Sequence, residues 1–65
     1  MHVMQDVNPE LSSIQTVLEE IAHRVKEITD RVAADPLDTR SPALIGVERS
    51  LAAAIRQITK AQKSR

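Results

Sequence analysis

Hydrophobic side chains recur along the first half of the chain at alternating steps of three and four residues. This spacing is the period of a helix with one apolar stripe, and a heptad repeat of this kind is typical of helices that pack lengthwise against other helices. The stripe widens at Val17, Ala22 and Thr29, which suits a bundle of more than two helices. Its members are Leu11, Ile14, Leu18, Ile21, Val25, Ile28 and Val32.

The second half of the chain repeats the pattern with smaller side chains. Ile55 lies beside this stripe, and the column Gly46, Ser50 and Ala54 would let another helix approach closely. Gly46 also has a simpler interpretation as a tolerated helix glycine, which costs about 1 kcal/mol relative to alanine. The second stripe consists of Leu44, Val47, Leu51, Ala54, Ile58 and Ala61.

Three prolines predict where the helices begin and end. Asn8-Pro9 and Ser41-Pro42 each resemble an N-cap residue followed by proline in the first helical turn. Asp35-Pro36 disfavours helical geometry at Asp35, so the first helix should end near residue 34. The sequence therefore predicts a flexible segment 1–8 and a single domain 9–62, followed by a tail 63–65. Within the domain we expect helices over about 9–34 and 42–62, joined by a loop over 35–41.

The chain is too short for two such helices to bury both stripes. It has 65 residues, 42% of them hydrophobic, with no aromatic residue and no cysteine. Disulfides are excluded, and ordering each residue costs about 1.5 kcal/mol, so a chain of this size needs help from oligomerisation. We therefore predict an all-α fold, an antiparallel helical hairpin that dimerises into a four-helix bundle. The predicted core and oligomer interface are Leu11, Ile14, Leu18, Ile21, Val25, Ile28, Val32, Leu44, Val47, Leu51, Ala54, Ile55, Ile58 and Ala61.

Charge divides the chain into two halves. Residues 1–39 hold eight acidic and three basic side chains, whereas residues 40–65 hold one acidic and six basic side chains. The net charge of zero therefore conceals −5 on one half and +5 on the other. An antiparallel hairpin would set the acidic beginning of the first helix beside the basic end of the second.

The basic end of the second helix is a candidate nucleic-acid contact. Cationic side chains without an intervening acid can neutralise phosphates, and a dimer would present two such patches. In overall plan, the expected dimer of short hairpins resembles the Rop family of plasmid copy-control proteins, which bind RNA. The alternative interpretation is that these bases pair across the bundle with glutamates of the first helix. The patch consists of Arg56, Lys60, Lys63 and Arg65.

A second candidate is the Glu20-Ile21-Ala22-His23 segment, whose ExxH spacing occurs in ferritin-like di-iron bundles. The heptad pattern places Glu20 and His23 away from the predicted core, whereas such ligands must project inward. We therefore expect no metal site, no cofactor and no catalytic residue.

Composition narrows the remaining function classes. A single glycine cannot form a phosphate-binding GxxxxGK[ST] or GxGxxG loop, and no serine lies in a GxSxG motif. No segment has the length of a membrane span, so we expect a cytoplasmic protein, although a basic helix lying on a membrane surface is a further alternative. The sequence favours a non-enzymatic interaction module, either a homo-oligomeric scaffold or a small regulator that docks on a larger protein. Its expected partners are itself and another protein.

Overall fold

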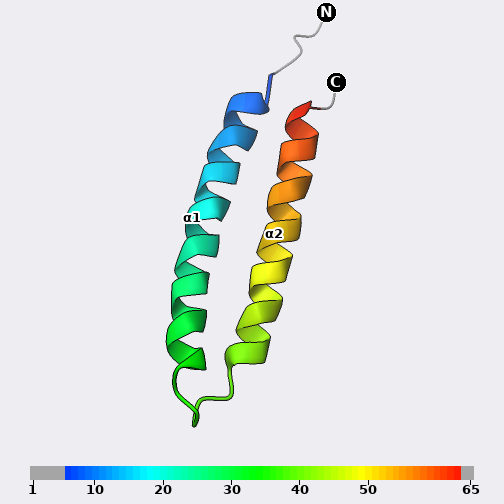
Figure 1. The fold of residues 1–65 in the computed structure, drawn as a ribbon. Coiled ribbons are helices and arrows are strands. Elements are labelled where there is room, and N and C mark those ends of the chain that lie inside the picture. Colours follow the sequence, from blue (N-terminus) through cyan, green and yellow to red (C-terminus); the bar gives the residue numbers. More distant parts are fainter. Residues whose placement is uncertain (1–5, 64–65) are drawn as a thin grey trace, which may run out of the picture.

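The fold is an antiparallel pair of helices, as the computed structural model of the chain shows for residues 6–63 (Figure 1). Helix α1 spans Asn8–Ala33 and helix α2 spans Ser41–Lys63. The predicted all-helical hairpin is confirmed, with helix ends within one residue of their expected positions. The expected flexible segment 1–8 and tail 63–65 lie mostly outside the described residues, and residues 8 and 63 are helical.

An aspartate just before each helix accepts a backbone N–H group: Asp6 lies two residues before α1 and Asp38 three residues before α2. Asn8 N–H donates to Asp6 Oδ1 and Arg40 N–H donates to Asp38 Oδ1, both at 3.0 Å. The expectation that Asn8 caps α1 is therefore wrong, since Asn8 is already helical and Asp6 supplies the acceptor. Asx turns of this kind are a common use of aspartate before a helix. They explain why both helices begin one residue earlier than the prolines predict.

The loop over residues 34–40 closes with further short-range hydrogen bonds. Ala34 N–H still donates to the Asp30 carbonyl, whereas Asp35 N–H donates to the Val32 carbonyl in a tighter turn. Asp35 Oδ1 then accepts the N–H of Leu37 at 3.0 Å. Pro36 has no N–H to donate and disfavours a helical residue before it, so the chain turns here as the sequence predicts.

The seam between the two helices uses one helical stripe from each. Its most enclosed members are Thr29 and Val32, which are 6% and 7% exposed and are the buried residues among those described. The Thr29 hydroxyl donates to the Val25 carbonyl at 2.8 Å, so its burial leaves no polar group unsatisfied. The seam residues are Leu11, Gln15, Leu18, Ala22, Val25, Thr29 and Val32 on α1, and Leu44, Glu48, Leu51, Ile55, Ile58 and Gln62 on α2.

A polar contact lies near the open end of this seam, where α1 begins and α2 ends. Gln62 Nε2 donates to Gln15 Oε1 at 2.6 Å, across 47 residues of sequence. The bond fixes the register of the hairpin, because it places residues whose numbers add to about 77 at a similar level. The sequence predicts a sum of about 76 for a loop centred near residue 38.

Candidate interaction face

Each helix leaves a row of apolar side chains outside the seam. On α1, Ile14, Ile21 and Ile28 are 47%, 38% and 41% exposed, although the heptad pattern places them at its centre. The residues that follow them, Gln15, Ala22 and Thr29, lie on the seam instead. The hairpin therefore turns three isoleucines of the predicted core towards solvent.

The rows from the two helices share one face of the hairpin. Each member immediately precedes a seam residue of its own helix, so each is rotated by about 100° in the same sense. Two antiparallel helices are related by a two-fold axis perpendicular to the plane that contains both helix axes. This rotation keeps each face of the hairpin on its own side, so residues that precede the seam on α1 and on α2 lie on the same face. We call this surface the isoleucine face: Ile14, Val17, Ile21 and Ile28 on α1 with Val47, Ala54 and Ala61 on α2.

The opposite face of the hairpin is more polar. Residues that immediately follow the seam lie there, including Glu19 and Lys26 on α1 and Ile45 on α2. Ile45 is 42% exposed, so single apolar residues do occur on this side. The isoleucine face differs in that large or small apolar residues recur on it every two turns of each helix, with Arg24 between Ile21 and Ile28. A gathering of exposed apolar side chains on one face is a mark of an interaction surface.

The predicted core residues are divided between the seam and the isoleucine face. Leu11, Leu18, Val25, Val32, Leu44, Leu51, Ile55 and Ile58 lie on the seam, whereas Ile14, Ile21, Ile28, Val47, Ala54 and Ala61 lie on the isoleucine face. The hairpin thus uses only part of the predicted core within one chain. The sequence pattern places Thr29 at the edge of the stripe but does not identify Gln15, Glu48 and Gln62 as seam residues, because a polar side chain gives no hydrophobic signal.

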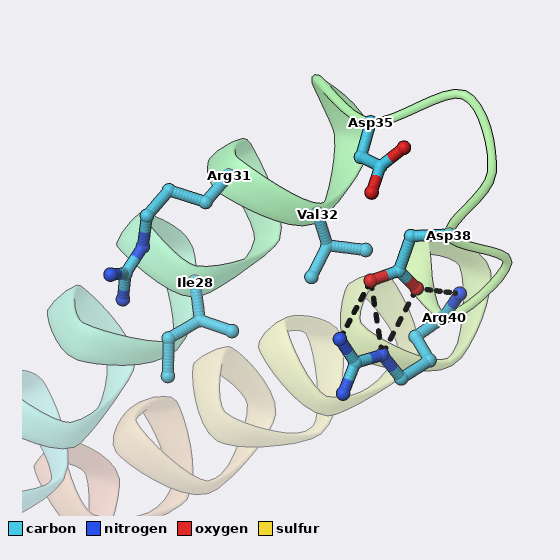
Figure 2. Close-up of a pocket in the computed structure, with 6 residues that line it drawn as sticks. All are labelled: Ile28, Arg31, Val32, Asp35, Asp38 and Arg40. Carbon is cyan, nitrogen blue, oxygen red and sulfur yellow. Dashed lines mark hydrogen bonds and ion pairs between the residues drawn. The ribbon is translucent and has the colours of Figure 1, made fainter.

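A hollow at the loop end is lined by the last turns of α1 and by the loop (Figure 2). Ile28 and Val32 form its apolar side, and Asp38 and Arg40 lie across from them. Arg40 Nη2 donates to Asp38 Oδ2 at 2.6 Å, and Arg40 Nε donates to Oδ1 at 3.0 Å. These side-chain hydrogen bonds, with the Arg40 backbone N–H and its positive charge, lower the pKa of Asp38 from 3.8 to about 2. The ion pair holds together the last residues of the loop, directly before α2.

The basic candidate residues lie on α2 near the open end of the hairpin. Arg56, Lys60 and Lys63 are exposed, and they lie outside both the seam and the isoleucine face. Arg65 is outside the described residues. A partner on the isoleucine face would therefore leave the described part of this patch accessible.

The ExxH residues are on the surface of α1. Glu20 and His23 are both exposed, and His23 Nε2 lies 3.5 Å from Glu27 Oε2, one helical turn further on. Within residues 6–63, no group of three or more His, Asp or Glu side chains could hold a metal ion. The described helices also lack a stretch that is both long and apolar enough to cross a membrane.

The surface features, taken together, leave the isoleucine face as the main candidate site. Its isoleucines belong to the predicted core, and yet they are 38–47% exposed in the hairpin. Comparison of the chain with protein-family models, with curated proteins and with solved structures finds no match.

Proposed function

We propose that the protein is a non-enzymatic interaction module that pairs with a second copy of itself through the isoleucine face. In this assembly, two hairpins stack face to face and form a four-helix bundle. The observation that carries the proposal is the exposure of Ile14, Ile21 and Ile28, at 38–47% each, in a hairpin whose described part buries only Thr29 and Val32. Full burial of an isoleucine side chain is worth about 1.5–3 kcal/mol, so covering this face is strongly favourable.

The total surface area supports the same proposal. The chain exposes 5500 Å², whereas a compact protein of 7.2 kDa is expected to expose about 4,100 Å². The difference is larger than the ~800 Å² that each partner buries in a protein interface of standard size. The surplus is therefore large enough in area to include an interface of standard size.

Mass in solution tests the proposal directly. Sedimentation equilibrium at micromolar concentration should give twice the chain mass of 7.2 kDa, with the monomer appearing on dilution. Circular dichroism along the same dilution series should show helix content falling with dissociation, because the hairpin alone has so small a core. A monomer that keeps its full helix content at micromolar concentration would show that the isoleucine face needs no cover.

A nucleic-acid-binding regulator is the second candidate, because the basic patch stays accessible when the isoleucine face is covered. Arg56 and Lys63 each follow a seam residue and so lie on the opposite face, and Lys60, between them in the sequence, is exposed as well. Binding by such a patch would weaken steeply with salt, since each neutralised phosphate releases counterions. Retardation of RNA and DNA duplexes at 50 and 200 mM salt would test it, with Arg56→Gln/Lys63→Gln as the variant expected to lose binding.

A further inference from the structure

We infer that in the dimer α1 of each copy lies on α2 of the other copy, with both loops at the same end of the bundle. This inference rests on the proposed self-association and specifies its geometry. Two face-to-face arrangements with two-fold symmetry are available. A two-fold axis parallel to the helices places α1 of each copy against α2 of the other copy; we call this the crossed arrangement. A two-fold axis perpendicular to the helices, in the plane between the two hairpins, places α1 against α1 and α2 against α2; we call this the like-on-like arrangement.

The two rows of the isoleucine face differ in size. The α1 row has isoleucine at 14, 21 and 28, and the α2 row has the smaller residues Val47, Ala54 and Ala61. The face therefore has a ridge along α1 and a lower strip along α2.

The ridge and the strip match in register. In the crossed arrangement, each residue of the partner's α2 lies at the same height along the bundle as the equivalent residue of the chain's own α2. Ile21 then lies opposite the partner's Ala54, and the pairs at either side are Ile28 with Val47 and Ile14 with Ala61. The residue numbers in each pair add to 75, whereas those of Gln15 and Gln62 add to 77. At a rise of about 1.5 Å per residue, the paired side chains are therefore offset along the bundle by about 3 Å.

The like-on-like arrangement would require different helix spacings in the two halves of the interface. Isoleucine on isoleucine holds the α1 pair apart, while alanine on alanine needs the α2 pair to come closer. Each hairpin is a single layer held by its seam, so both pairs must accept nearly the same spacing. Protein interiors pack without voids, and large residues placed against small ones satisfy this condition across the whole face.

Charge favours the same arrangement. Helix α1 carries five acidic and three basic side chains, and α2 carries one acidic and four basic side chains. In the crossed arrangement every acidic helix has two basic neighbours and no acidic one. Like-on-like stacking would instead bring the two net negative helices together, and the two net positive ones.

Cysteine cross-linking tests the inference, because the chain has no cysteine of its own. Ile21→Cys and Ala54→Cys are made separately, mixed under dissociating conditions, refolded together and oxidised. The crossed arrangement predicts a disulfide between the two different variants at a yield at least tenfold above that of either variant alone. Ile45→Cys, on the opposite face, is the control that should not cross-link with either.

The outcomes separate the arrangement from the dimer itself. If Ile21→Cys alone forms the disulfide efficiently within a particle of dimer mass, the crossed arrangement is overturned and self-association stands. If the wild-type chain sediments as a monomer and no pair cross-links, the proposed function fails together with this inference. Efficient cross-linking through Ile45→Cys would place the interface on the opposite face and overturn the inference as well.

Discussion

Replacing Ile21 with aspartate should separate the two copies, because this residue lies in the middle of the isoleucine face. The side chain is 38% exposed in the hairpin. Covering that fraction is worth about 0.6–1.1 kcal/mol per copy, taking 1.5–3 kcal/mol for full burial. The aspartate also places an unpaired carboxylate in the interface, at a cost of several kcal/mol. With two copies per dimer, the loss is at least about 4 kcal/mol, or nearly a thousandfold in the dissociation constant.

Ile45→Asp is the matched control. Ile45 has the same side chain and a similar exposure of 42%, but it lies on the opposite face. Within the hairpin, the two substitutions should therefore cost similar amounts. A difference between them then reports only on the second copy.

Sedimentation equilibrium and circular dichroism at the same micromolar concentration provide the assay. We expect Ile21→Asp to sediment as a monomer with reduced helix content, and Ile45→Asp to remain a dimer. The reasoning fails if Ile21→Asp keeps the wild-type dissociation constant. It fails equally if Ile45→Asp dissociates to the same extent, because the loss would then come from general destabilisation.

Four further substitutions test separate parts of the hairpin. Val32→Ala should lower the free energy of unfolding in urea by about 2 kcal/mol, since Val32 is 7% exposed, whereas Leu37→Ala, at an 89% exposed position, should change it by less than about 0.5 kcal/mol. Gly46→Ala should stabilise the hairpin by about 1 kcal/mol because the added methyl group meets open space; a lower melting temperature would show that a second helix occupies that space. The Asp38 pKa of about 2 is below its ordinary value of 3.8, so the ion pair stabilises the fold fully above about pH 4, and this contribution is lost as the pH falls towards 2. Asp38→Asn should make the melting temperature depend less on pH between about pH 4 and 2. An unchanged dependence would contradict the assignment of this effect to the ion pair with Arg40.

The helices themselves could be predicted from the sequence because proline acts locally. Pro9, Pro36 and Pro42 restrict the backbone wherever they occur, so they indicate helix ends without knowledge of the tertiary fold. The one-residue shifts come from Asp6 and Asp38, whose side chains accept backbone N–H groups two residues later. Such an acceptor competes with the predicted caps, and sequence pattern alone does not rank them.

The division of the apolar stripe could not be predicted in the same way. A seven-residue repeat specifies a broad stripe, but it does not say which edge of the stripe meets the helix of the same chain. In the hairpin the seam passes through Gln15 and Thr29, whose polar groups find partners in Gln62 and in the Val25 carbonyl. Hydrogen bonds of this kind lower the cost of burying polar side chains, so Ile14 and Ile28 remain outside.

The hairpin brings the beginning of α1 and the end of α2 to one end of the molecule (Figure 1). Crossed dimers would therefore gather all four of these helix ends at a single pole, while like-on-like dimers would send them in pairs to opposite poles, about 40 Å apart for helices of this length. Any fluorophore, label or domain fused at Lys63 would then sit beside its counterpart in the first case and far from it in the second. Because the hairpin puts both helix ends at one end of the molecule, the arrangement of the two copies decides whether pairing also brings fused domains together.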